Sequence, residues 1–151
     1  MQKHRNTWFI LADGAKARIL QRRASEPRSF TVIDHEESAE ALSPSRELAT
    51  DRPGRSYESA NPSRHAVQWK TDPHEAAKSR FEQKIADLVN RAAEQGLFDA
   101  LVLVAPPRVL GDVRKALSAQ ARERLILEEG KDLLGLPEHI LTNRLTALLR
   151  R

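Results

Sequence analysis

The feature that most constrains the fold of this chain is the continuous apolar run Ala-Leu-Val-Leu-Val-Ala at residues 100–105. A strand with one face in water alternates apolar and polar side chains, so an unbroken run is typical of a strand buried on both faces. Helices must then cover the sheet from above and below. The run is far shorter than the roughly 20 apolar residues that cross a membrane. The sequence therefore predicts an α/β fold with three layers.

Three antiparallel strands are expected before this central strand. The aromatic and β-branched stretch 7–12 and the alternating stretch 15–20 lie on either side of Asp13-Gly14, a turn signal. After a polar turn, residues 30–33 supply a third strand. The hairpin and its turn carry the basic residues Lys16, Arg18, Arg22, Arg23 and Arg28. We interpret these charges as protection of an exposed edge strand against edge-to-edge pairing.

The longest helix is expected to begin at Pro73 and to end before Gly96. Asp72 can cap its first turn, proline fits the first helical position, and Glu75 lies three residues after the cap. Apolar residues recur every three or four positions along one face of this helix. The opposite face is expected to be solvated and carries Lys78, Glu82, Arg91 and Glu94.

Two shorter helices complete the predicted order. One opens at Pro106-Pro107, the other begins at Pro137 after the poor cap Leu136, and a short strand at 125–127 lies between them. The order β-β-β-α-β-α-β-α predicts a mixed five-stranded sheet with helices on both faces, in one α/β domain over residues 1–151. Gly111 costs its helix about 1 kcal/mol relative to alanine, which indicates close helix packing or backbone approach by a partner.

Residues 34–75 differ in character from the rest of the chain. They hold four of the eight prolines and show no helical or strand period. An irregular segment of this length inside a compact domain is usually either functional or disordered. Both interpretations stay open, and the segment is treated as a long functional or disordered loop between the third strand and the first long helix.

The candidate binding residues lie in this loop and at the start of the helix that follows. Arginine and lysine contact phosphates, and aromatic rings stack on unpaired bases. The candidate nucleic-acid- or anion-binding residues are Arg52, Arg55, Tyr57, Arg64, His65, Trp69, Lys70, His74 and Arg80. Secondary candidates are Arg18, Lys131 and Asp132. The plainer alternative is a solvated loop whose aromatic residues pack on the body and whose arginines pair with nearby carboxylates.

The composition and the absence of known motifs exclude several classes of catalytic and metal site. The chain has 25 Lys and Arg against 21 Asp and Glu, a formal charge of +4 that permits an anionic partner without requiring one. It has no cysteine, which excludes disulfides, thiol nucleophiles and cysteine-based zinc sites. Histidine metal motifs, serine-hydrolase elbows, P-loops and dinucleotide fingerprints are absent from the sequence. We therefore expect no metal, no cofactor, no catalytic residue, no export signal and no membrane insertion.

Carboxylates at strand ends deserve a separate test, because several of them can converge on magnesium in phosphodiester-cleaving enzymes. The candidates are Asp13, Asp99 and Asp132. Asp13 is explained by its hairpin turn and Asp99 by its place before the buried strand. Nothing in the sequence shows that the three converge, so a metal-dependent nuclease is not favoured.

Short strings along nearly the whole chain resemble one bacterial family. They are the hairpin 12–20, the loop run 51–57, Arg64-His65, 71–74, Arg80-Phe81, 101–107, Leu110-Gly111 and Lys131-Asp132. In order and spacing they resemble the host attachment protein family, named for a role in attachment of plant-associated bacteria to their hosts. That family is similar to the middle domain of archaeal and eukaryotic class 1 peptide release factors. The resemblance implies a ribonuclease H-like fold with a mixed sheet of five strands.

In the release factors, the loop between the third strand and the long helix carries a Gly-Gly-Gln motif that enters the ribosomal peptidyl transferase centre. The matching segment here is 34–75, where Gly54 is the sole glycine. The resemblance thus implies a module that binds RNA or the ribosome, although the sequence lacks the peptide-release motif. The lack of cysteine and of a targeting segment leads us to expect a cytoplasmic location. Two alternatives stay open: a hydrolase acting on RNA or peptidyl-tRNA through Arg64, His65 and His74, and a module that binds another protein. The oligomeric state is open too.

Overall fold

The computed structural model describes residues 6–42 and 72–150. Its strands form one five-stranded sheet in the order β3-β2-β1-β4-β5. They are β1 (Asn6–Ala12), β2 (Lys16–Arg23), β3 (Phe30–Glu37), β4 (Ala100–Val104) and β5 (Leu125–Glu129). The first three strands pair antiparallel, whereas β4 runs parallel to both β1 and β5. The prediction of a mixed five-stranded sheet in an α/β fold is confirmed.

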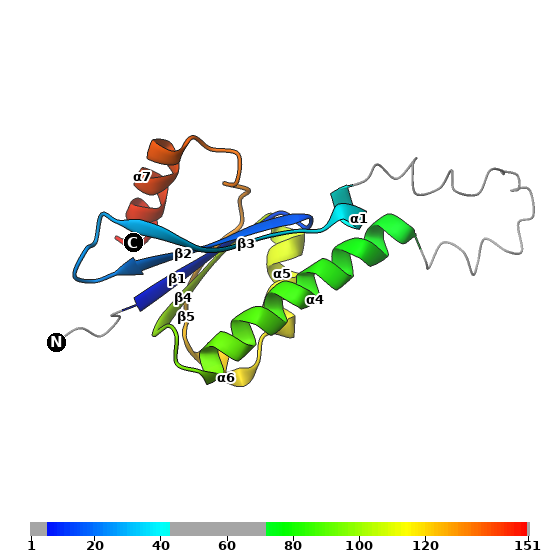
Figure 1. The fold of residues 1–151 in the computed structure, drawn as a ribbon, viewed down its shortest axis with the longest axis horizontal. Helices are drawn as coiled ribbons and strands as arrows, with labels where there is room; N and C mark the ends of the chain where they lie inside the picture. The colour runs from blue at the N-terminus through cyan, green and yellow to red at the C-terminus, as the bar shows by residue number, and fades with distance from the viewer. Residues whose placement is uncertain (1–5, 43–71, 151) are drawn as a thin grey trace, which may run out of the picture.

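Helices cover both faces of this sheet (Figure 1). One face carries α4 (Pro73–Glu94), α5 (Pro107–Ala116) and α6 (Ala119–Glu123), and the other carries α7 (Glu138–Leu148). The start of α4 is confirmed in detail, because the Asp72 side chain accepts a hydrogen bond from the His74 backbone N–H at 2.9 Å and proline follows the cap. Gly96 ends the helix with a φ of +71°, a conformation that favours glycine.

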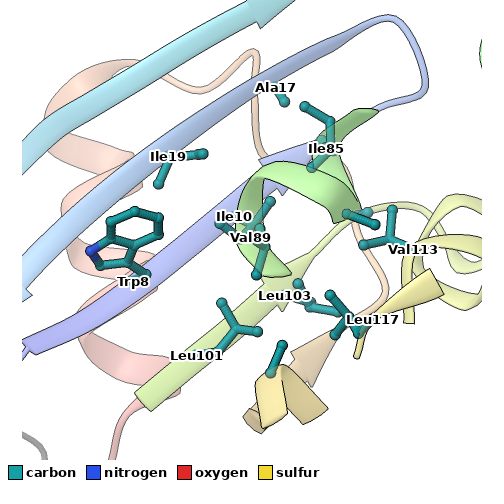
Figure 2. Packing of buried hydrophobic residues seen from close by; sticks show 14 of the residues in the cluster. Trp8, Ile10, Ala17, Ile19, Ile85, Val89, Leu101, Leu103, Val113 and Leu117 are labelled. Atoms are coloured by element: carbon teal, nitrogen blue, oxygen red, sulfur yellow. The ribbon is translucent and has the colours of Figure 1, made fainter. Parts of the chain in front are cut away.

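The core lies in two layers on either side of the central strands. Every residue of β4 is buried, as the apolar run predicts. Along β1, Trp8 and Ile10 point into the cluster beneath α4 and α5, while Phe9 and Leu11 point into the cluster beneath α7. Figure 2 shows the first cluster, in which Val89 of α4 lies over Ile10. Both faces of the sheet are therefore buried against helices.

The predicted irregular segment 34–75 is partly regular at its two ends. Residues 34–37 complete β3, and α1 (Ala39–Leu42) follows at once. The acidic side chains are compatible with a strand because β3 is an edge strand of the sheet and stays largely exposed; Glu36 pairs with Lys84 at 3.0 Å. The short helices α1 and α6 were not predicted, since four or five residues are too few to show a helical period.

The interpretation of the basic hairpin as edge protection is wrong. β2 continues through Arg23 and lies between β1 and β3, so its basic residues are not on an edge strand. The edge strands are β3 and β5, and the charges of β3, the strand next to β2, are mostly acidic. The hairpin pattern alone could not reveal which strand would be outermost, because that depends on where the third strand pairs.

Candidate functional site

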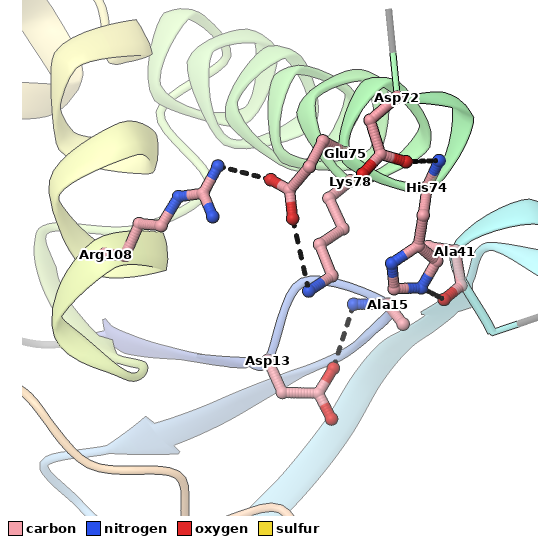
Figure 3. Close-up of polar contacts among 8 residues, drawn as sticks. All are labelled: Asp13, Ala15, Ala41, Asp72, His74, Glu75, Lys78 and Arg108. Atoms are coloured by element: carbon pink, nitrogen blue, oxygen red, sulfur yellow. Dashed lines mark hydrogen bonds and ion pairs between the residues drawn. The ribbon is translucent and has the colours of Figure 1, made fainter. Parts of the chain in front are cut away.

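Two of the candidate binding residues, His74 and Arg80, join α1 to α4. The His74 ring nitrogen Nε2 lies 2.9 Å from the Ala41 carbonyl oxygen, and the Arg80 guanidinium donates to the Glu40 carboxylate at 2.8 Å. Figure 3 shows the His74 ring turned toward Ala41 and its backbone N–H donating to Asp72. Both side chains therefore have structural partners within the fold. In this arrangement the His74 Nε2 atom is engaged with a carbonyl, which does not favour the alternative of His74 as a hydrolytic base.

The other seven primary candidates lie outside the described residues. They are Arg52, Arg55, Tyr57, Arg64, His65, Trp69 and Lys70. The structure describes the chain up to Leu42 and again from Asp72, and the bond between His74 and Ala41 links these two flanks. The described residues on either side of this gap are therefore in contact.

We expect His74→Ala to loosen α1 while leaving the sheet intact. Removing a net contribution of about 0.5–1.5 kcal/mol from the His74–Ala41 bond should speed amide exchange in α1 roughly 2- to 10-fold. Hydrogen exchange followed by mass spectrometry measures this in the peptide that contains residues 39–42. Ser79→Ala on the exposed surface of α4 is the control and should leave α1 exchange unchanged. Equal exchange in both variants would show that the ring does not hold α1.

The secondary candidates each have their own local partner. Arg18 pairs with Glu138 of α7 at 3.3 Å, so it belongs to the face of the sheet opposite His74 and Arg80. Lys131 lies 3.7 Å from the Glu129 carboxylate, and the Asp132 carboxylate accepts from the Leu134 backbone N–H at 3.0 Å. The fold does not gather Arg18 with the residues at the start of α4.

Two of the strand-end carboxylates accept hydrogen bonds from backbone N–H groups, Asp13 within the β1–β2 turn and Asp99 from the start of β1. Asp13 accepts from the backbone N–H groups of Ala15 and Lys16 at 2.9 and 2.8 Å, and Asp99 accepts from that of Asn6 at 2.9 Å. Within residues 6–42 and 72–150, no group of three or more His, Cys, Asp or Glu side chains could hold a metal ion. In the same ranges, no helix has the length and apolar content to cross a bilayer.

A polar cluster that the sequence pattern does not predict lies between α4 and α5. Glu75 of α4 pairs with Arg108 of α5 and lies 4.0 Å from Lys78 (Figure 3). About two helical turns further along α4, Glu82 is 7% exposed and shares a hydrogen bond with Asp112 of α5. Burial of Glu82 and this contact with a second carboxyl group raise the pKa of Glu82 to about 7.

The prediction that Glu82 is solvated is therefore wrong. Glu82 precedes Ala86, Val89 and Ala93 at helical spacing, and all three are buried. This second row widens the buried face of α4 beyond the apolar stripe that contains Phe81. Ala86 and Ala93 are the sequence signal that this side of α4 is buried, because small side chains on a helix allow a neighbouring helix to pack closely.

Taken together, the sheet order and the helices on both faces define an α/β domain with a release-factor-like fold. The structure is similar to an archaeal translation termination factor, aRF1, with a TM-score of 0.51 and 10% identity, over 97% of this chain and 39% of that one. It also matches Saccharomyces cerevisiae Dom34, described as a translation termination-like factor involved in RNA quality control pathways and interacting with Hbs1. That match has a TM-score of 0.44 and 10% identity, over 97% of this chain and 35% of that one. This chain thus spans well under half the length of either protein.

The sequence itself places the chain in a family. Residues 8–145 match the family described as "Protein required for attachment to host cells", and the chain belongs to that family. No curated protein matches the sequence. The resemblance to host attachment proteins is thereby confirmed, whereas the finer ribonuclease H-like assignment stays a prediction.

Proposed function

We propose that this chain is an RNA- or ribosome-associated binding module. The observation that carries the proposal is the fold shared with an archaeal translation termination factor over 97% of this chain. At 10% identity this likeness concerns the fold, so the partner must be argued from the residues. A cytoplasmic location follows from the proposal, because RNA and ribosomes are found there.

The residues that support binding lie between β3 and α4. Four candidate cations, one histidine and two aromatic rings fall in the segment 51–70, a combination suited to phosphates and unpaired bases. The flanks of this segment are joined by the contacts of His74 and Arg80 with α1. A segment whose ends are held together has less conformational entropy to lose on binding than one with free ends. The sequence contains no Gly-Gly-Gln, so we propose binding rather than peptide release.

A triple variant, Arg52→Ala with Arg55→Ala and Arg64→Ala, tests the proposal. We expect wild-type protein to bind ribosomes or tRNA with an affinity that falls steeply with salt, because phosphate contacts release counterions. The variant should bind more weakly, and its slope of log affinity against log salt should be smaller by about 2–3 units, close to one unit per lost phosphate contact. Cosedimentation at several salt concentrations measures both quantities.

A second triple variant controls for net charge. Arg91→Ala, Arg144→Ala and Arg150→Ala remove the same three charges from exposed positions on α4, on α7 and just after α7. This control should keep the wild-type affinity and salt slope. The proposal is wrong if wild-type protein shows no salt-sensitive binding, or if the two triple variants behave alike.

Tryptophan fluorescence can test directly whether Trp69 stacks on RNA. Trp8 is buried, with its ring centroid 5.1 Å from that of Phe98, whereas Trp69 is a candidate stacking residue. In a Trp8→Phe variant, Trp69 is the sole tryptophan of the chain. Addition of RNA should then change its fluorescence, since stacking on a base alters the surroundings of the indole.

A further inference from the structure

Gly111 lies on the outer face of α5, away from the core. The buried residues of α5 are Val109, Leu110 and Val113, and Gly111 is only partly buried. A Cβ atom built on Gly111 would meet the Arg114 guanidinium at 3.8 Å and no other described side chain or neighbouring element within 4 Å. The prediction that Gly111 permits close packing between helices of this chain is therefore not met by the described structure.

Backbone conformation does not explain this glycine either. Among the described residues, positive φ angles occur at Gly14 and Gly96, and Gly111 has ordinary helical geometry. Glycine is the least favourable residue in a helix interior apart from proline. α5 also lacks a side-chain cap, because Pro106 stands at the cap position and offers no hydrogen bond. A residue that weakens an already poorly capped helix, without filling a packing role, indicates contact with something outside the fold.

Three cations neighbour the partly buried Gly111 on the surface of α5. Arg108, Arg114 and Lys115 lie three positions before, three after and four after it, and these spacings are neighbours on a helix surface. Lys115 is exposed. Arg108 pairs with Glu75 and Arg114 with Glu128, but the two guanidinium side chains remain 67% and 42% exposed, so a stronger anion can compete for them.

Apolar side chains are missing from this face. The large exposed hydrophobic residues of the described chain lie on other elements, and α5 contributes none. A protein partner normally buries an apolar centre within a polar rim. A bare backbone surrounded by cations instead suits the sugar-phosphate backbone of a nucleic acid, which carries negative charge and can approach a helix closely where no side chain projects.

We infer that α5 is a second contact surface for RNA, in which a phosphate group lies against Gly111 between Arg108, Arg114 and Lys115. This inference rests on the proposed RNA-binding function and extends it from the 51–70 segment to the described body of the molecule. The glycine supplies space and the three cations supply charge. Specificity for base sequence is not expected here, because contacts to phosphates position a nucleic acid without reading it.

Substitution of Gly111 by alanine separates an effect on folding from an effect on binding. The stability of the protein should rise, whereas its affinity for RNA should fall. Gly111→Ala should raise the melting temperature by about 2–4 °C, since alanine favours the helix. The same variant should weaken binding of tRNA or ribosomes about 2- to 5-fold, and Gly111→Leu should weaken it at least 10-fold. Lys115→Ala should lower the salt slope by about 1 unit.

Ala147→Leu is the matched control, because Ala147 is exposed on α7, on the opposite face of the sheet. It should leave RNA binding unchanged. If Gly111→Leu binds like the wild type while Arg52→Ala with Arg55→Ala and Arg64→Ala is impaired, the α5 inference is wrong and the proposed function stands. If wild-type protein does not bind RNA at all, both fail. Weaker binding by the more stable Gly111→Ala cannot come from misfolding and would support the inference.

Discussion

Leu145→Ala is expected to lower the free energy of unfolding by about 2–5 kcal/mol, because it leaves a cavity in the core beneath α7. Leu145 is fully buried and belongs to the cluster that includes Phe9, Leu11 and Val102. α7 has no side-chain cap, since Pro137 stands at its cap position, so packing is its main attachment to the sheet. Urea unfolding followed by circular dichroism measures the loss.

Ile140→Ala is the matched control for this prediction. Ile140 is on the same helix but is 36% exposed, so its truncation removes less buried surface and leaves no closed cavity. We expect a loss below about 1 kcal/mol for this variant. Similar losses in the two variants would contradict the view that α7 is held by its buried face.

Stability should fall as the pH rises from about 5 to 8. In the folded protein the pKa of Glu82 is about 7, against an ordinary value of 4.5, because burial and the neighbouring Asp112 disfavour its charged form. Between these two values the folded state binds a proton that the unfolded state releases, so raising the pH favours unfolding. The contribution is fully present below pH 4.5 and is lost as the pH passes through 7. A shift of this size corresponds to about 1–3 kcal/mol.

Glu82→Gln tests the assignment of this pH dependence. Glutamine keeps the shape and a hydrogen-bond donor toward Asp112 without a titrating group, so the variant should be more stable than the wild type at pH 8 and lose the slope. Glu94→Gln changes an exposed residue on the same helix and should keep the wild-type slope. Urea unfolding at pH 5, 6, 7 and 8 measures how the free energy of unfolding depends on pH. Equal slopes for wild type and Glu82→Gln would refute the assignment.

Part of the candidate site could be predicted from the sequence. The cap at Asp72 and the proline after it place His74 in the first turn of α4, as predicted. The partner of the His74 ring was not predictable, because it is a backbone carbonyl of α1, a helix too short to leave a periodic signal. The role of the 51–70 residues stays a prediction, since they lie outside the described part of the chain.

Charged residues at interfaces were the main source of error. Glu82 and Arg18 are polar by type, and local pattern assigned the first to solvent and the second to an edge strand. Their positions depend on which helix or strand packs beside them. Glu82 packs against α5, whereas Arg18 lies on a strand flanked by β3 and pairs with α7. Such neighbours are distant in sequence, so no local pattern encodes them.

By itself, the sequence determined the class of fold, the unbroken apolar strand at its centre, the start and end of α4 and membership of the family. The fold class, the central strand and the ends of α4 follow from periodicity, capping and turn chemistry, which act over a few neighbouring residues, whereas membership of the family follows from the match over residues 8–145. Tertiary structure alone decided that β3 rather than β2 is an edge strand, that Glu82 is buried against Asp112, that His74 contacts α1, and that Gly111 lies on the outer face of α5 near cations. Each of those depends on contacts between segments far apart in the chain, because burial and charge environment are properties of the packed molecule.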